Sequence, residues 1–183
     1  MDGRFVIEGK LGCPMCSASY PIAGGVADLR ESRGAKLVNV NDTPGEDADA
    51  TALRVAAMLG LTRAGGVAVL SAMTSSVAGL VAELASVRVV GTNATTPSSD
   101  ERENVAMVLS DERLPFASGS IDAVMLGSVA RSGEVGEAVR VLRTGGRLVV
   151  PAGTALGGNL RELARDDRYI VAESTGPLLN LSR

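Results

Sequence analysis

Residues 137–150 read Glu-Ala-Val-Arg-Val-Leu-Arg-Thr-Gly-Gly-Arg-Leu-Val-Val, and this stretch decides the fold. Its first part belongs to a segment with helical apolar spacing, residues 134–142. Gly145 and Gly146 then supply backbone angles that let the chain reverse, and residues 147–150 form an apolar strand. A helix that passes through a glycine pair into a buried strand is typical of α/β proteins.

The same alternation of helix and strand extends toward the N-terminus. We predict two further helices, at residues 48–62 and 77–85. The other apolar runs predict four more strands, at residues 67–70, 87–90, 105–109 and 121–126. Because these runs lack polar alternation, we expect a parallel sheet that is covered on both faces. The sequence therefore predicts a doubly wound, mostly parallel α/β fold.

The two ends of the chain differ from this body. Residues 1–40 hold short extended pieces between turn residues, and we expect a small β-rich appendage there, followed by the α/β domain at residues 41–183. Residues 160–164 have helical spacing. Two strands at 169–172 and 178–181, joined by a short turn, should pair antiparallel. With five parallel strands, they predict a seven-stranded sheet with an antiparallel C-terminal edge hairpin.

Composition excludes several classes of function. The chain has no histidine, so it has neither a Ser-His-Asp nor a Cys-His nucleophile pair and no histidine-ligated catalytic zinc. Its 18 basic residues are scattered among 21 acidic ones, for a net charge of -3, and its aromatic content is only 2%. We therefore expect no binding of nucleic acid, which requires clustered cations or stacking platforms.

The sequence also bears on where the protein is located. Residues 64–82 carry no charge and approach the length of a membrane span, but hydroxyl side chains occupy the centre, so we expect no membrane segment. Two cysteines are too few for a disulfide framework, and the first residues contain no apolar signal core. These features predict a cytoplasmic protein.

Two motifs resemble the class I S-adenosylmethionine-dependent methyltransferases. Leu114-Pro115-Phe116, followed by residues 120–124, is similar to the "LPF...SFD.V" run of that family, and residues 137–150 are similar to its "E..RVLKPGGRL.." run. The resemblance covers about residues 49–183. It implies a seven-stranded Rossmann-like fold with S-adenosylmethionine as cofactor. The residue chemistry alone gives both motifs a mainly structural role, because Pro115 stops a helix and Gly145-Gly146 let the chain turn.

The cofactor loop departs from the family pattern. After the strand at 67–70, the chain has no glycine until Gly79. The resemblance places Ser71 at the opening of the loop, where an acid is common, and Met73, Ser75 and Val77 where the family has three glycines. A methionine side chain there would occupy space that the ligand needs. The hydroxyls beside Ser75 could attract an anion at the helix N-terminus or cap the helix.

Three further positions complete the candidate cofactor site. The resemblance places Asn93 where the family has an acid that binds the ribose hydroxyls, and an amide makes a weaker hydrogen bond than a carboxylate. Asp111 matches the position that often holds the adenine amine, although a loop aspartate is also a common turn or cap residue. Gly127 lies at the carboxyl end of the fourth strand, where such sheets bind ligands.

Cys13-Pro-Met-Cys16, with the Tyr-Pro-Ile phrase at residues 20–22, resembles half of a zinc-ribbon module associated with methyltransferases. A structural zinc ion needs four ligands, and this chain offers only these two cysteines. Zinc is therefore expected only if two subunits share it. A ribbon remnant without metal and a redox pair are the alternatives.

These observations lead to competing functions. The favoured one is a catalytically degenerate methyltransferase-like protein that acts through a protein partner or as a homo-oligomer. The alternative is an active methyltransferase on a small molecule or a protein, which does not require histidine because methyl transfer depends mainly on positioning. No catalytic residue is assigned. An enzyme that uses another nucleotide is the weakest reading, because the chain has neither a G-x-G-x-x-G after a strand nor a phosphate loop.

Overall fold

Ten strands form one sheet in the computed structural model, which describes residues 6–14, 17–31, 47–71, 75–93, 104–111, 113–127 and 132–176. The side chains of Ser75, Ser76 and Ser132 lie outside this description. The strand order is β1-β2-β3-β6-β5-β4-β7-β8-β10-β9. The described sheet therefore has ten strands and not the predicted seven, because the N-terminal strands join the same sheet.

The centre of the sheet consists of five parallel strands, listed here by position: β4 (Val67–Ser71), β5 (Arg88–Thr92), β6 (Val105–Leu109), β7 (Ile121–Met125) and β8 (Leu142–Pro151). β4 lies between β5 and β7, so the direction in which successive strands are added reverses at β4. In an open α/β sheet, ligands bind beyond the carboxyl ends of the strands at such a reversal. The fold thus places the candidate site above β4 and its neighbours.

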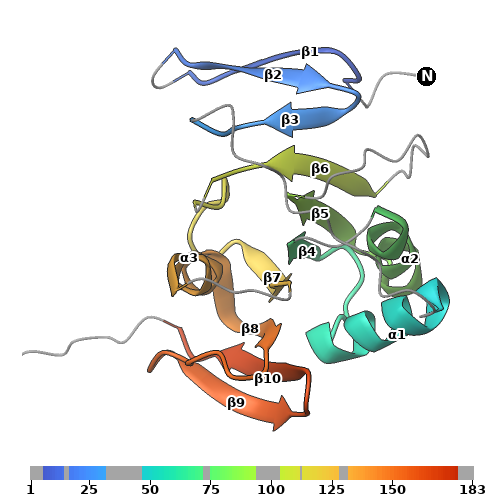
Figure 1. Ribbon diagram of the computed structural model, residues 1–183, viewed down its shortest axis with the longest axis vertical. Coiled ribbons are helices and arrows are strands. Elements are labelled where there is room, and N and C mark those ends of the chain that lie inside the picture. Colours follow the sequence, from blue (N-terminus) through green and yellow to red (C-terminus); the bar gives the residue numbers. More distant parts are fainter. Residues whose placement is uncertain are drawn as a thin grey trace, which may run out of the picture.

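Three helices cover the two faces of this central sheet (Figure 1). α1 (Ala48–Leu59) and α2 (Ser75–Ala85) pack on one face, over Leu70, Val89 and other inward side chains of the strands. α3 (Ser132–Val141) packs on the other face, over Val69, Val124 and their neighbours. Alternate residues of each strand enter opposite cores, which explains why the central strands read as unbroken apolar runs.

The N-terminal strands extend the sheet at one edge. β1 (Gly9–Gly12), β2 (Ser19–Ala23) and β3 (Val26–Asp28) pair antiparallel with one another. β3 then pairs parallel with β6, with Val26 opposite Met107. The expected β-rich appendage is therefore present, and it is continuous with the main sheet through the β3–β6 ladder.

The C-terminal edge differs from the sequence prediction. Residues 160–164 were predicted to be helical, but they form β9 (Leu160–Arg165), which pairs antiparallel with β10 (Tyr169–Ser174). β10 also pairs antiparallel with β8, so the antiparallel edge is confirmed. The hairpin consists of β9 and β10, and the strand predicted at residues 178–181 lies outside the described residues.

Candidate functional site

The predicted site residues that the structure describes lie along the carboxyl edge of the sheet. Ser71 is the last residue of β4, Asn93 follows β5, Asp111 follows β6 and Gly127 follows β7. Because these four strands are neighbours, the four residues fall on one edge of the molecule. Of the remaining two, Met73 lies outside the described residues, and Ser75 is the first residue of α2.

Asn93 uses its side-chain oxygen within the fold. Its backbone has a positive φ of 58°, a conformation that asparagine tolerates better than most residues, and its N–H donates to the carbonyl of Val108. The side-chain Oδ1 accepts a hydrogen bond of 3.0 Å from the backbone N–H of Ser110. Asn93 thus ties the carboxyl ends of β5 and β6 together.

Asp111 also holds the backbone of a distant segment. Its Oδ2 accepts a hydrogen bond of 2.8 Å from the N–H of Glu31, just beyond β3. Two residues earlier, the N–H of Leu29 donates to the carbonyl of Leu109 at 2.8 Å. Asp111 therefore fixes the chain that leaves the N-terminal strands, and one of its carboxylate oxygens is used in this contact.

Two buried hydroxyls at this edge are unsatisfied. Thr92 is fully buried and Ser110 is 5% exposed, and neither Thr92 Oγ1 nor Ser110 Oγ has a hydrogen-bond partner among the described residues. Ser71 and Thr92 are register partners, so their side chains share a face of the sheet. Burying a hydroxyl without a partner costs about 1–3 kcal/mol. Such groups suit a polar ligand, and in this respect the edge fits the ribose of a nucleoside cofactor.

Sequence reasoning did not single out Thr92 and Ser110. The available signal was their position: each is a hydroxyl residue at the end of an otherwise apolar run, in Val-Val-Gly-Thr92 and in Val-Leu-Ser110. A polar side chain at the carboxyl end of a buried parallel strand lies where ligands bind in this architecture.

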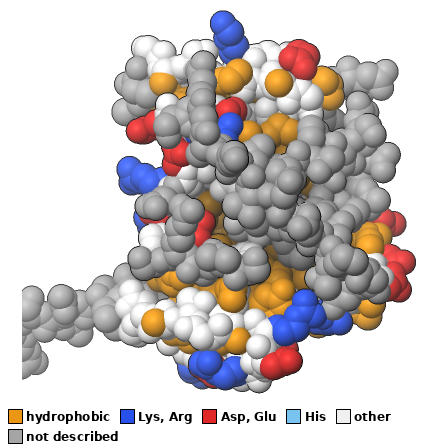
Figure 2. All heavy atoms as spheres, in the orientation of Figure 1, with side chains coloured by type: hydrophobic (Ala, Val, Ile, Leu, Met, Phe, Trp, Pro, Cys, Tyr) orange, Lys and Arg blue, Asp and Glu red, His pale blue; other side chains and the backbone are white. Residues whose placement is uncertain are grey.

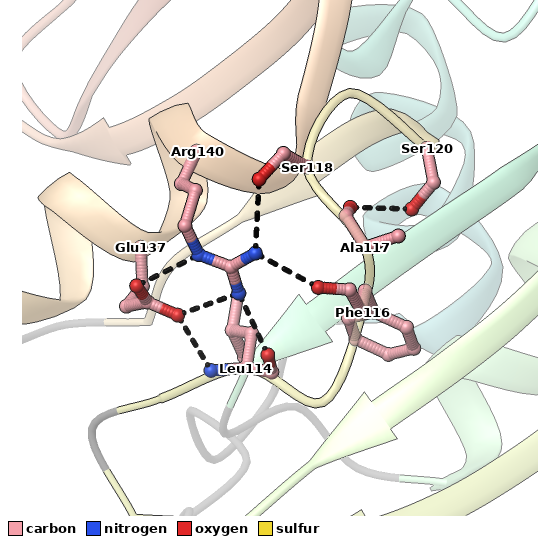
Figure 3. Close-up of polar contacts among 7 residues, drawn as sticks. All are labelled: Leu114, Phe116, Ala117, Ser118, Ser120, Glu137 and Arg140. Carbon is pink, nitrogen blue, oxygen red and sulfur yellow. Dashed lines mark hydrogen bonds and ion pairs between the residues drawn. The ribbon is translucent and has the colours of Figure 1, made fainter.

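Hydrogen bonds join the LPF motif to an ion pair within α3 (Figure 3). Arg140 Nε and Nη2 donate to the two carboxylate oxygens of Glu137, at 2.9 and 2.8 Å. The same guanidinium donates to the carbonyls of Phe116 and Leu114, each at 2.9 Å. Glu137 in turn accepts from the N–H of Leu114, so the pair fixes both the loop and the helix.

This geometry explains the pKa of Glu137. The hydrogen bond from Arg140 and the N–H of Leu114 stabilise the charged carboxylate and outweigh the cost of burial, so the pKa of Glu137 lies below its ordinary value. The motif residues that resemble the methyltransferase family here perform a structural task, as the physical reading of the sequence predicted.

A second carboxylate, Asp122, connects three elements. Burial alone would raise the pKa of Asp122, but hydrogen bonds from the N–H of Val67 (2.8 Å) and from Arg143 Nε (2.6 Å) lower it. Asp122 begins β7, Val67 begins β4, and Arg143 lies at the entry to β8. The "D.V" part of the motif therefore aligns the amino ends of three strands and lies at the end of the sheet opposite to the candidate site.

The predicted metal residues are only partly described. Cys13 is half-buried in the turn after β1, where its N–H donates to the carbonyl of Ala18, and Cys16 lies outside the described residues. Within the described part of the chain, no three histidine, cysteine, aspartate or glutamate side chains group as a metal site would require. The structure thus adds no support for zinc.

Solved structures with similar architecture identify the fold. A candidate S-adenosyl-L-methionine-dependent methyltransferase of Methanococcus maripaludis aligns with a TM-score of 0.55 at 9% identity, over 73% of this chain and 87% of that one. A TehB-like methyltransferase of Corynebacterium glutamicum aligns with a TM-score of 0.50 at 14% identity, over 73% and 90%. This is a class I methyltransferase fold.

The chain spans only part of the length of some other proteins with which it aligns. Against a geranyl diphosphate methyltransferase the chain spans 43% of the longer protein, and against a Bacillus halodurans protein it spans 52%. No protein-family model matches the sequence, and no curated protein matches it either. Among the described helices, none has the length and apolar character needed to cross a membrane.

Proposed function

We propose that this chain is a methyltransferase-like protein with a degenerate cofactor site that acts through protein association. The observation that carries the proposal is the internal use of the two polar side chains expected to hold the cofactor. Asn93 Oδ1 accepts from Ser110, and Asp111 Oδ2 accepts from Glu31. Oxygens that hold the backbone are no longer fully available to ribose hydroxyls or an adenine amine.

The sequence of the cofactor loop supports the same proposal. Methionine and serine stand at positions where the resemblance places glycines, and asparagine stands where it places an acid. A ligand that needs close backbone approach is then excluded by side-chain volume, and a charge-assisted hydrogen bond, about twice as strong as a neutral one, is lost. The LPF run and residues 137–150, which stabilise the fold, are retained. This is the pattern expected when a protein loses cofactor binding but keeps its fold.

Restoring the missing features tests this account. Thermal melting with and without S-adenosylhomocysteine is compared for the wild-type protein and for the double variant Met73→Gly/Asn93→Asp. Aspartate can still accept from Ser110, so the variant should keep the contact between β5 and β6. We expect stabilisation of the variant alone by the ligand, whereas equal stabilisation of the wild-type protein would contradict a degenerate site.

An exposed apolar edge supports association. β1 is the outermost strand on one side of the sheet, and Val6 and Ile7 just before it are 57% and 46% exposed. Figure 2 shows hydrophobic side chains at the surface of the N-terminal strands, at the top of the view. The opposite edge strand, β9, carries three charged residues, Arg161, Glu162 and Arg165, of the kind that block edge-to-edge pairing, whereas β1 carries only Lys10. We therefore propose that a second copy of the chain pairs through β1.

Light scattering tests this association. The wild-type protein should have the mass of a dimer at micromolar concentration, and Ile7→Lys should shift it toward the monomer. Leu53→Lys, a change at an exposed leucine of α1, serves as the matched control and should leave the dimer intact. A wild-type protein that is monomeric throughout would overturn the β1 dimer.

Active methyl transfer is the second candidate function, and Thr92 is the observation that favours it. Its buried Oγ1 has no partner in the described structure and shares a face with Ser71, so it could bond to a ribose hydroxyl. If the site is active, Thr92→Val should weaken binding of S-adenosylhomocysteine about tenfold, the loss of one hydrogen bond to a buried group. No binding to either protein would eliminate this candidate.

Two smaller predictions accompany the proposal. Zinc, if it binds, should be held by Cys13 and Cys16 of two subunits, and elemental analysis would then give half a zinc ion per chain. A cytoplasmic location, inferred from the composition, is tested by fractionation of the producing cell.

A further inference from the structure

A cavity of about 570 Å³ lies between the N-terminal strands and the core, away from Ser71 and Gly127. Its volume is within the range of about 300–1,000 Å³ that is usual for small-molecule sites. One wall comes from the N-terminal strands and from Leu29, which directly follows β3. The other wall comes from the residues after β6, the LPF loop and α3. The lining residues central to the argument are Leu11, Tyr20, Leu29, Ser110, Arg113 and Phe116.

The first sign of a ligand is Ser110. It lines the cavity and is only 5% exposed, and its Oγ has no hydrogen-bond partner among the described residues. A buried hydroxyl without a partner is unfavourable unless something else bonds to it. The backbone N–H of Ser110 already donates to Asn93 Oδ1, so the hydroxyl is the polar group of this side chain that still lacks a partner.

The second sign is the charge at the cavity. Arg140 lines it, but this guanidinium is committed to Glu137 and to the carbonyls of Leu114 and Phe116. Arg113 also lines the cavity and is exposed, and it lowers the pKa of Glu137 only through space. Among the described residues Arg113 forms no ion pair, so its guanidinium is the charge of this wall that a ligand can bind, while the carboxylate of Asp111 keeps its own charge and accepts from the N–H of Glu31.

The third sign is the apolar and aromatic lining. The whole chain has two tyrosines and two phenylalanines, and one of each, Tyr20 and Phe116, lines this cavity. Leu11 lines it as well and is 48% exposed, which leaves apolar surface for a ligand to cover. Aromatic side chains favour flat apolar ligands, because such rings stack at little entropic cost.

We propose that this cavity binds a small molecule with a flat apolar body and one carboxylate. The body packs between Tyr20 of the N-terminal strands and Phe116 of the LPF loop. The carboxylate pairs with Arg113 and accepts a hydrogen bond from Ser110 Oγ. The N-terminal strands thereby form one wall of a binding site that meets the carboxyl edge of the sheet at Ser110.

Calorimetric titration with 2-naphthoate and with its neutral counterpart 2-naphthamide tests the proposal. The two probes share their apolar body and differ in charge. We expect both to bind the wild-type protein, with the carboxylate about fivefold to tenfold tighter, the size of one partly exposed charge-assisted contact. Failure of both probes to bind, or equal affinity for the two, would overturn it.

Variants place the probes in the cavity. Arg113→Gln, a change at an exposed side chain, should bring naphthoate to the affinity of naphthamide, whereas Arg161→Gln on the distant strand β9 should change neither. Leu11→Glu should weaken both probes at least tenfold, with the melting temperature confirming that the variant folds. An Arg113→Gln protein that keeps the full preference for naphthoate would contradict the assignment. Because S-adenosylhomocysteine is absent from this experiment, its outcome is separate from that of the proposed function.

Discussion

Single residues at this molecule's two ends perform different tasks. Asp122 near the amino end of β7 and Glu137 in α3 hold arginines and backbone N–H groups that set the positions of β4, β7 and the LPF loop. At the carboxyl ends, Asn93 and Asp111 accept hydrogen bonds from the backbone N–H groups of Ser110 and Glu31. The residues that resemble the family motifs therefore position strands and loops, and they do not identify a ligand site.

Replacing Arg140 should be costly. Arg140→Met leaves Glu137, whose side chain is 17% exposed, without its cation, and it removes the donors to the carbonyls of Leu114 and Phe116. We expect a loss of about 2–4 kcal/mol in the free energy of unfolding, because a charge is left nearly buried and unpaired. Urea denaturation measures the loss. Arg165→Met on β9, at an exposed ion pair that solvent screens, should cost clearly less.

Replacing Thr92 should have the opposite effect on the free energy of unfolding. In the absence of ligand, Thr92→Val removes a buried hydroxyl that has no partner in the described structure and keeps the shape of the side chain. We expect the protein to become more stable by about 1 kcal/mol. The same change at Thr51, which is half-buried in α1 and has partners, should not stabilise. A destabilised Thr92→Val protein in urea would show that the hydroxyl is satisfied in solution.

At the scale of elements, the sequence predicted the regular parts well. The three helices and four of the five parallel strands appear within three residues of their predicted bounds, because apolar runs and helical spacing are local signals. The fifth, β8, begins at Leu142, five residues before its predicted start, so the glycine pair lies inside the strand and not before it. The failure at β9 has a physical reason. Leu160, Leu163 and Ala164 have helical spacing and high helix propensity, but pairing with β10 outweighs that preference.

The site was less predictable than the fold. Its residues were found because they follow strands, and the structure places four of them on one edge. The partners of Asn93 and Asp111 could not be found in this way, because Ser110 and Glu31 are 17 and 80 residues away along the chain. The joining of β3 to β6 was missed for the same reason, since strand pairing between distant segments leaves no local pattern.

The first half of β8 supplies a matched pair of glycine variants at Gly145 and Gly146. Gly145 has a φ of 76°, but an added Cβ would meet open space, whereas at Gly146 it would lie 2.9 Å from the carbonyl oxygens of Arg143 and Asp122. Gly145→Ala should therefore cost about 1 kcal/mol through its backbone angle alone. Gly146→Ala should cost clearly more, because two backbone segments must move. If both variants lost the same free energy of unfolding in urea, the close approach of the Asp122 carbonyl of β7 to Gly146 would be contradicted.

For the whole molecule, the two carboxylates predict how stability depends on pH. The pKa values of Asp122 and Glu137 are lowered by folding, so both groups stabilise the protein above their unfolded values of about 3.9 and 4.3. This contribution is lost as the pH falls through the lower, folded values. Melting temperatures of the wild-type protein should therefore fall below about pH 5.

Variants assign this dependence. Asp122→Asn and Glu137→Gln should each lower stability at pH 7 and flatten its decline toward pH 3. Glu83→Gln, which removes an exposed carboxylate of α2 that forms no ion pair among the described residues, should leave the profile close to that of the wild-type protein. Profiles of equal slope for all four proteins would show that the two ion pairs do not couple to folding.

The central claim about the whole molecule is that a methyltransferase fold has lost its cofactor. Calorimetric titration of the purified wild-type protein with S-adenosylhomocysteine tests it most directly, because the product analogue needs no methyl acceptor in order to bind. The account predicts no detectable heat and an unchanged melting temperature at millimolar ligand. Saturable binding with a micromolar dissociation constant would contradict it and would identify the chain as a cofactor-binding methyltransferase.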